Sequence, residues 1–204
     1  MLTRRRILVT GLAAGTVTMM PLSAPLSAQE TARAPAPTAV DWMTPRFVSV
    51  QGGIGPSEIH VDPDRFALYW TLGDGKAIRY AVGIGRPGLY EAGRFHVGAK
   101  KEWPSWTPTP DMIAREPELY APWADGMPGG PDNPLGARAL YLFTSDGADT
   151  FMRIHGTNAP QTIGTAVSNG CVRLLNEHVM DLYDRVPEGT PVYLHPPSAA
   201  PLPA

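Results

Sequence analysis

Short apolar runs separated by polar residues fill most of the chain, which is the pattern of half-buried strands. Gly, Pro and Asp punctuate these runs, and residues 72–76 (Leu-Gly-Asp-Gly-Lys) read as a hairpin turn between two of them. We therefore expect a mostly β domain. Its expected strands are Ile59–Asp62, Phe66–Trp70, Ala77–Gly83, Gly93–Gly98, Ala139–Phe143, Thr150–Ile154 and Pro191–Leu194.

One segment, directly after the cysteine, has the spacing of an amphipathic helix. Asn176 is suited to cap its start, and Pro187 follows its end. Its apolar positions recur every three or four residues, at Val179, Leu182, Tyr183 and Val186. We expect this helix to pack beneath the Cys171 strand and His178 to lie at the solvated surface.

The segment between Trp103 and Pro134 shows neither the alternation of a strand nor the three-to-four-residue spacing of a helix. It contains eight prolines and three tryptophans. A stretch of this length inside a compact domain is usually functional or disordered, and the tryptophans argue against disorder. We expect an ordered loop that forms a wall or lid of a cleft; the alternative is a structural loop whose Trp103, Trp106 and Trp123 only cover the core.

The first 28 residues have the composition of a secretory signal. Three arginines precede an apolar run, and Leu26-Ser27-Ala28 is a small-residue cleavage site. The arginine pair followed by Ile7-Leu8 favours the twin-arginine route over the general secretory route. We expect a signal peptide at 1–28, a leader or linker at 29–45, a catalytic domain at 46–196 and a tail at 197–204. Either route predicts an exported, periplasmic protein.

Charge and cofactor motifs exclude several classes of function. The formal net charge is −2, and loss of the three signal-peptide arginines makes it −5, so we expect no nucleic-acid partner. The five histidines are scattered without ligand spacing, so we expect no metal. The glycines of residues 83–88 lack a βαβ context and indicate a loop, not a nucleotide site. We expect no cofactor.

Cys171 is the only cysteine, and His155 precedes it by sixteen positions. A thiol attacks as its thiolate and needs a base or cation nearby, which an imidazole supplies. A strand that ends at Gly156, followed by a loop and a returning extended segment, brings the two side chains together. The alternative for the cysteine alone is a buried, inert residue. The turn at Asn169-Gly170 offers backbone N–H groups for an oxyanion.

These residues lie in a run that strongly resembles the YkuD-type L,D-transpeptidase catalytic domain of bacterial cell-wall enzymes. The run is IHGTNAPQTIGTAVSNGCVRLLNEHVMDLYDRVPEGTPVYL, and the segments KKEWPSWTP and NPLGAR upstream also match the family. The resemblance covers roughly residues 55 to 195. One position departs from it, because the family often has a second histidine where this chain has Asn169.

The resemblance implies a YkuD-like β-sandwich or barrel with one main helix after the cysteine and the long Pro/Trp-rich loop. It implies Cys171 as nucleophile and His155 as general acid and base, with a backbone carbonyl near Gly156 orienting the imidazole. Support of the thiolate or oxyanion falls to Gly170, Ser168, Asn169 and Gly156. Arg173 is expected to bind a substrate carboxylate, or to bridge to an acid on the final helix.

The implied reaction joins peptidoglycan stem peptides by 3→3 cross-links, or attaches an outer-membrane protein to peptidoglycan, with loss of D-Ala from a tetrapeptide stem. Carbapenems are the implied inhibitors. Two alternatives stay open: an L,D-carboxypeptidase or peptidoglycan hydrolase with the same Cys-His site, and a non-catalytic cell-wall binding module.

Overall fold

The computed structural model describes residues 42–50 and 54–198. The expected signal peptide, residues 29–41 of the expected leader and residues 199–204 of the expected tail lie outside the described residues. In the described part no helix is long and apolar enough to cross a membrane.

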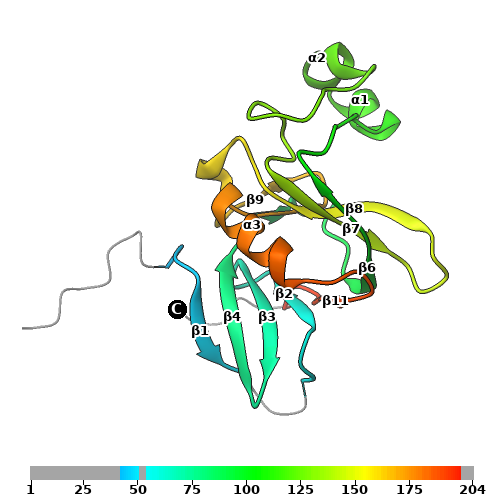
Figure 1. Ribbon diagram of the computed structural model, residues 1–204. Helices are drawn as coiled ribbons and strands as arrows, with labels where there is room; N and C mark the ends of the chain where they lie inside the picture. Colours follow the sequence, from blue (N-terminus) through cyan, green and yellow to red (C-terminus); the bar gives the residue numbers. More distant parts are fainter. Residues whose placement is uncertain (1–41, 51–53, 199–204) are drawn as a thin grey trace, which may run out of the picture. The chain divides into compact units, whose positions relative to one another are not determined.

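The fold is mostly β, as expected, and it is built on a sheet of nine strands in the order β1-β4-β3-β2-β11-β6-β7-β8-β10, with a second sheet of β5 and β9 (Figure 1). The strands of the large sheet are β1 (Arg46–Ser49), β2 (Ile59–Asp62), β3 (Ala67–Gly73), β4 (Lys76–Ala81), β6 (Gly93–Glu102), β7 (Arg138–Phe143), β8 (Asp149–His155), β10 (Val172–Arg173) and β11 (Pro191–Leu194). The small sheet pairs β5 (Ile84–Gly85) with β9 (Ala166–Ser168) in parallel.

The predicted hairpin is present between β3 and β4, where Gly73, Asp74 and Gly75 all adopt positive φ. These are the residue types that tolerate the left-handed turn conformation.

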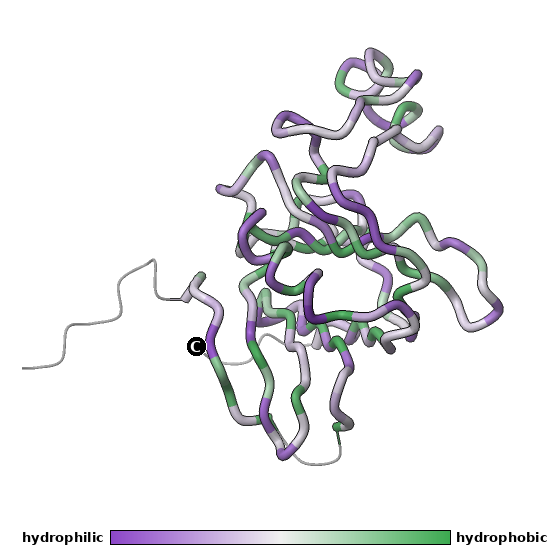
Figure 2. Tube along the Cα trace, in the orientation of Figure 1, coloured by the Kyte–Doolittle hydropathy of each residue, from purple (hydrophilic) through white to green (hydrophobic). Residues whose placement is uncertain are grey.

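The expected helix is α3 (Asn176–Arg185), and it buries Val179 and Leu182 against the sheet. Figure 2 shows hydrophobic residues concentrated in the strands around this helix. The cap was assigned wrongly, because the N-cap residue is Leu175 and Asn176 begins the helix. The Asn176 carboxamide instead accepts hydrogen bonds from the backbone N–H groups of Ala137 (3.0 Å) and Thr157 (3.1 Å), which ties the start of α3 to two loops.

His178 was also placed wrongly by the pattern, since it is only 6% exposed. Its ring lies 6.4 Å from that of Tyr80, whose hydroxyl donates to the Asp181 carboxylate at 2.5 Å. Tyr80 belongs to β4, which is distant from the helix in the sequence. The pattern of the helix alone therefore does not reveal that β4 covers the face carrying His178.

The Pro/Trp-rich segment contains two short helices, α1 (Pro110–Arg115) and α2 (Pro117–Tyr120), followed by a 3-10 turn, Ala121–Trp123. Each begins with a proline in its first turn, where the missing N–H costs nothing. Neither these helices nor the turn has a buried residue. In Figure 1 α1 and α2 lie beyond the ends of β6 and β7. We call residues 110–123 the helical segment.

Candidate active site

Parallel pairing of β8 with β10 brings His155 and Cys171 to the same place. Val172 pairs with Ile154 and Arg173 with His155, so Cys171 directly precedes a strand that lies beside the end of the histidine strand. Both side chains line a cavity of about 830 Å³. The structure therefore brings together the two residues that the sequence singled out.

A backbone carbonyl fixes the His155 ring. The imidazole is 3% exposed, and its Nδ1 lies 2.6 Å from the carbonyl oxygen of Gly156. Because a carbonyl only accepts hydrogen bonds, Nδ1 carries the proton and Nε2 is left as the basic nitrogen. Gly156 itself is constrained, since a Cβ at this position would collide with Oδ1 of Asn176.

Burial keeps the His155–Cys171 pair uncharged at rest. Removal from water, together with the nearby cations Arg173 and Arg153, lowers the pKa of His155 to about 3. Burial also raises the pKa of the Cys171 thiol, although a hydrogen bond with the Arg153 backbone and the Arg153 and Arg173 cations oppose the shift. The thiol donates a long hydrogen bond to the carbonyl of Phe151, with 3.9 Å between sulfur and oxygen. The site thus holds a neutral thiol and a neutral base.

Arg173 lies in the wall of the same cavity and faces no carboxylate. Its Nε is buried and has no hydrogen-bond partner, and none of the ion pairs among the described residues includes it. The expected alternative, a bridge to an acid of α3, is absent, because Asp181 pairs with Arg185 and Tyr80 instead. Arg173 is partly buried, and a guanidinium whose buried Nε has no partner is suited to bind an anion that enters the cavity.

Ser168 and Gly170 shape the turn that carries the nucleophile. The Ser168 hydroxyl donates to the Cys171 carbonyl at 2.6 Å and accepts from the Gly170 N–H at 3.2 Å. The Gly170 N–H is therefore occupied within the turn. Gly170 has φ of 117°, and a Cβ there would lie 3.0 Å from the Leu89 carbonyl, so only glycine fits without strain.

Asn169 points its side chain at the helical segment. Its Oδ1 accepts from Arg86 and from Arg115, each at 2.9 Å, and its Nδ2 donates to the Tyr120 hydroxyl at 2.7 Å. Arg86 also forms an ion pair with Glu116. A single imidazole nitrogen has one lone pair and cannot accept from two guanidinium groups, so an asparagine serves this junction where a histidine would not.

The cavity wall includes the helical segment, in agreement with the expected wall or lid. Trp106, Tyr120 and Trp123 line it, and Trp106 and Tyr120 pack edge to face with ring centroids 6.1 Å apart. Trp103 and Trp123 are 45% and 42% exposed, so they do not serve to cover the core.

Several site residues were not singled out by sequence reasoning. Arg86, Arg115 and Tyr120 lie 49 to 83 positions from Asn169 along the chain, and no local pattern links them to it. Arg153 carried a weak signal, because it lies two positions before His155 and therefore on the same face of β8. No group of three or more His, Cys, Asp or Glu in the described residues has the geometry to hold a metal ion.

Several curated proteins are similar to this chain in sequence. The probable L,D-transpeptidase YbiS of Escherichia coli K12 is 40% identical over 126 residues, which is 61% of this chain and 39% of that protein. The probable L,D-transpeptidase ErfK/SrfK of the same strain is 35% identical over 139 residues, 67% of this chain and 43% of its own length. The chain thus spans about two fifths of the length of these relatives.

Solved structures share the fold. An Enterococcus faecium L,D-transpeptidase mutant is 19% identical with a TM-score of 0.52, covering 70% of this chain and 50% of that chain. A Brucella melitensis protein described as a probable carnitine operon oxidoreductase is 48% identical, with a TM-score of 0.51, and the match covers 72% of this chain and 90% of that one. The oxidoreductase description concerns the Brucella protein.

A family model decides the assignment. The model of the YkuD L,D-transpeptidase catalytic domain matches residues 56–194, which hold all the strands from β2 to β11, the cavity and the pair His155–Cys171. The chain belongs to the YkuD family of L,D-transpeptidase catalytic domains.

Proposed function

We propose that this protein is a periplasmic L,D-transpeptidase that forms 3→3 cross-links between peptidoglycan stem peptides by acyl transfer through Cys171. The observation that carries the proposal is that His155 at the end of β8 and Cys171 directly before β10 line one cavity, beside Arg173, whose Nε has no partner.

The first half-reaction forms a thioester. Cys171 Sγ attacks the carbonyl that joins the third, L-centred residue of a tetrapeptide stem to its terminal D-Ala, and the S–H proton passes to Nε2 of His155. The carbon–nitrogen bond then breaks, and the imidazolium returns that proton to the departing amine of D-Ala. Because imidazole and thiol are both neutral at rest, proton transfer accompanies the attack and does not precede it.

The second half-reaction resolves the thioester. A side-chain amine of a neighbouring stem attacks the carbonyl, gives a proton to His155 and expels the thiolate, which is reprotonated. The thioester conserves the energy of the peptide bond, so no nucleoside triphosphate is consumed. In this proposal the N–H of Cys171 itself supplies an oxyanion donor, since the Gly170 N–H is engaged by Ser168.

Arg173 binds the carboxylate of the terminal D-Ala in this proposal. The Nε of the partly buried guanidinium is already out of water, and a carboxylate that enters the cavity gives it the partner that the protein does not. An amidated terminus lacks that charge and is expected to be a poor donor.

Two further features belong to the proposal. The same acyl-enzyme can pass its peptide to an amine of an outer-membrane protein, which would attach that protein to peptidoglycan. Carbapenems are expected to acylate Cys171. The alternative in which water resolves the thioester makes the protein an L,D-carboxypeptidase.

The deciding experiment incubates the protein with a disaccharide-tetrapeptide and identifies products by mass spectrometry, beside a Cys171→Ala control. Dimers that have lost one D-Ala and require Cys171 support the transpeptidase. Tripeptide without dimer shows a carboxypeptidase. No Cys171-dependent product, together with an unmodified intact mass after incubation with a carbapenem, would leave only the cell-wall binding module.

A further inference from the structure

Strand β8 carries a bulge directly beside the nucleophile. Tyr141 of β7 pairs with Arg153, and the next pair is Phe143 with Asp149, so Leu142 alone on β7 faces three residues of β8. The middle one of these three is Phe151, whose carbonyl accepts from the Cys171 thiol. Bulges of this kind re-aim backbone and side-chain groups and are common next to active sites.

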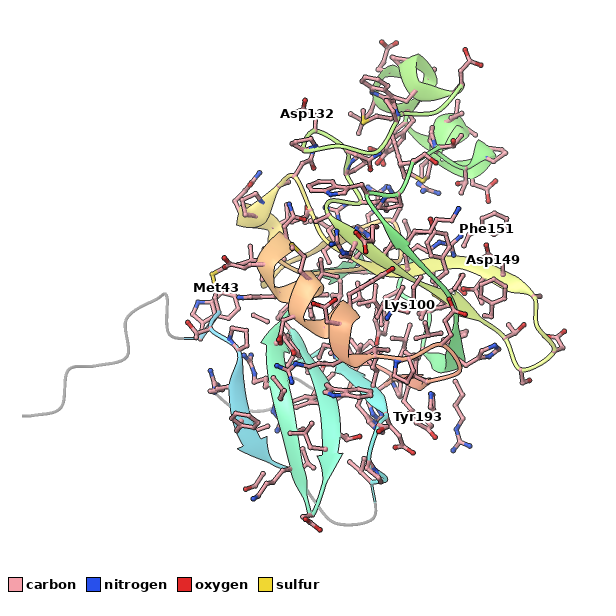
Figure 3. All side chains as sticks on the ribbon, in the orientation of Figure 1. Met43, Lys100, Asp132, Asp149, Phe151 and Tyr193 are labelled. Atoms are coloured by element: carbon pink, nitrogen blue, oxygen red, sulfur yellow. The ribbon has the colours of Figure 1, made fainter. Side chains whose placement is uncertain are left out.

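The bulge forces Phe151 into a strained backbone. Its φ is 60°, in the left-handed region that aromatic residues rarely enter. The ring is 71% exposed and points away from the sheet (Figure 3), so burial of the side chain does not compensate for the strain. This conformation directs the Phe151 carbonyl toward the sulfur of Cys171.

Side chains on both sides hold this conformation. The Asp149 carboxylate accepts from the Phe151 N–H at 2.8 Å and from the Arg153 guanidinium at 2.6 and 2.8 Å. Thr150 donates to the Leu142 carbonyl at 2.6 Å and accepts from the Met152 N–H at 3.2 Å.

The Arg153 side chain, which pairs with Asp149, is held in place as well. The Arg153 guanidinium stacks 4.0 Å from the centre of the Tyr141 ring, and its side chain is 11% exposed. Asp149 and Arg153 therefore form a partly buried bidentate bridge across the bulged residues, which is stiffer than an exposed pair.

We propose that Asp149 is a positioning residue for the nucleophile: it holds the β8 bulge through Arg153 and the Phe151 N–H, so that the Phe151 carbonyl orients the Cys171 S–H in the cavity until His155 takes the proton. The thiol proton leaves this carbonyl for Nε2 of His155 when the carbon–sulfur bond forms. Asp149 neither lines the cavity nor contacts the sulfur, and it acts through the strand and through its pairing with Arg153.

The inference rests on Cys171 being the nucleophile of the proposed function, but its test needs no peptide. The pH dependence of Cys171 alkylation by iodoacetamide reports the titration of the thiol directly. Failure of the cross-linking assay and failure of this test are therefore observed separately.

Asp149→Asn removes the bidentate bridge to Arg153, and Asp62→Asn is a matched control. Asp62 also bridges to an arginine, with Arg65 Nη1 donating to its Oδ2 at 2.8 Å, and accepts from the N–H of Asp64 at 3.1 Å, but it does not line the cavity. We expect Asp149→Asn to move the alkylation midpoint to lower pH, because the thiol loses its acceptor and the Arg153 cation loses its counter-ion. A shift of one unit makes alkylation at neutral pH about tenfold faster, and Asp62→Asn leaves the midpoint in place.

Two further variants separate position from charge and from loss of fold. Thr150→Val alters no charge and is expected to shift the midpoint in the same direction; it also carries the test if Asp149→Asn does not fold. In a Phe151→Gly background, where glycine adopts the left-handed conformation freely, Asp149→Asn is expected to shift the midpoint less. Circular dichroism and thermal melting establish that each variant is folded. An unchanged midpoint in folded Thr150→Val would overturn the proposal even if Asp149→Asn shifts, because loss of the Arg153 counter-ion alone can cause the latter shift. An unchanged midpoint in folded Asp149→Asn, or an equal shift in Asp62→Asn, would overturn it as well.

Discussion

Strands β8 and β10 line the same cavity as the helical segment 110–123, but the two regions are held in different ways. The strands place His155 and Cys171 through backbone pairing, with Ile154 and Val172 0% and 1% exposed beneath them. The helical segment buries no residue and contacts the nucleophile turn through the side chain of Asn169. His155 and Cys171 are thus fixed by the sheet, whereas the helical segment depends on a few side-chain contacts, two of which are hydrogen bonds to Asn169.

Replacing His155 gives the largest effect expected from the sheet side. His155→Gln keeps a side chain of similar length but removes the base, so turnover should fall by about 10²–10⁴-fold with KM little changed. Steady-state release of D-Ala measures it. A loss below tenfold in a folded variant would mean that the sheet-borne pair is not the catalytic centre.

Arg173→Met should change activity and stability in opposite directions. Loss of the carboxylate partner lowers turnover of a tetrapeptide, by about 10- to 100-fold if the pair is worth 1.5–3 kcal/mol. Loss of a partly buried charge whose Nε has no partner should raise the melting temperature by about 2–4 °C per kcal/mol gained. The D-Ala assay checks the fall in turnover, and calorimetry checks the rise in melting temperature. A fall in melting temperature would point to a structural role for Arg173.

Acid should weaken the fold through His155. The folded pKa of about 3 lies below the ordinary value of 6.5, so the unfolded chain binds more protons as pH falls from 6.5 toward 3. Stability present above pH 6.5 is therefore lost at up to about 1.4 kcal/mol per pH unit in that window. Urea unfolding at pH 7 and pH 4 should show a smaller difference for His155→Gln than for the unchanged protein; equal differences would contradict the low pKa.

Substitution of Asn169 should have the smallest effect on the stability of the fold and a selective effect on the helical segment. Asn169→Ala removes the acceptor of Arg86 and Arg115 and the donor to Tyr120, so proteolysis within 110–123 should become faster while the melting temperature falls by only a few degrees. The acyl-enzyme should then lose more of its peptide to water, raising the ratio of tripeptide to dimer about two- to fivefold, less than 1 kcal/mol. Tyr120→Phe, which removes one bond only, is the graded control.

The local pattern around Cys171 was sufficient to predict that His155 and Cys171 lie close together. A strand ending at Gly156 and a return through Asn169-Gly170 leave few ways to connect sixteen residues, and the parallel register of β8 with β10 is one of them. The mostly β class and the single long helix followed from periodicity in the same way.

Contacts between distant segments were beyond that reasoning. His178 is buried because β4 supplies Tyr80, and Asn176 faces two loops instead of its own helix. The positive φ of Phe151 contradicts its residue type, and the hydrogen bonds of Asp149 and Thr150 across the bulge explain it. In each case tertiary partners override the local preference of the residue.

The position of β11 has a consequence for how the domain folds. This strand, residues 191–194, lies between β2 and β6 and pairs in parallel with residues 59–61 near the other end of the domain. Without it the large sheet divides into β1–β4–β3–β2 and β6–β7–β8–β10. Closing it requires a contact across most of the described chain, which makes the rate-limiting step of folding slow and strongly dependent on topology. The two halves of the sheet become one cooperative unit only after residue 194 has left the ribosome.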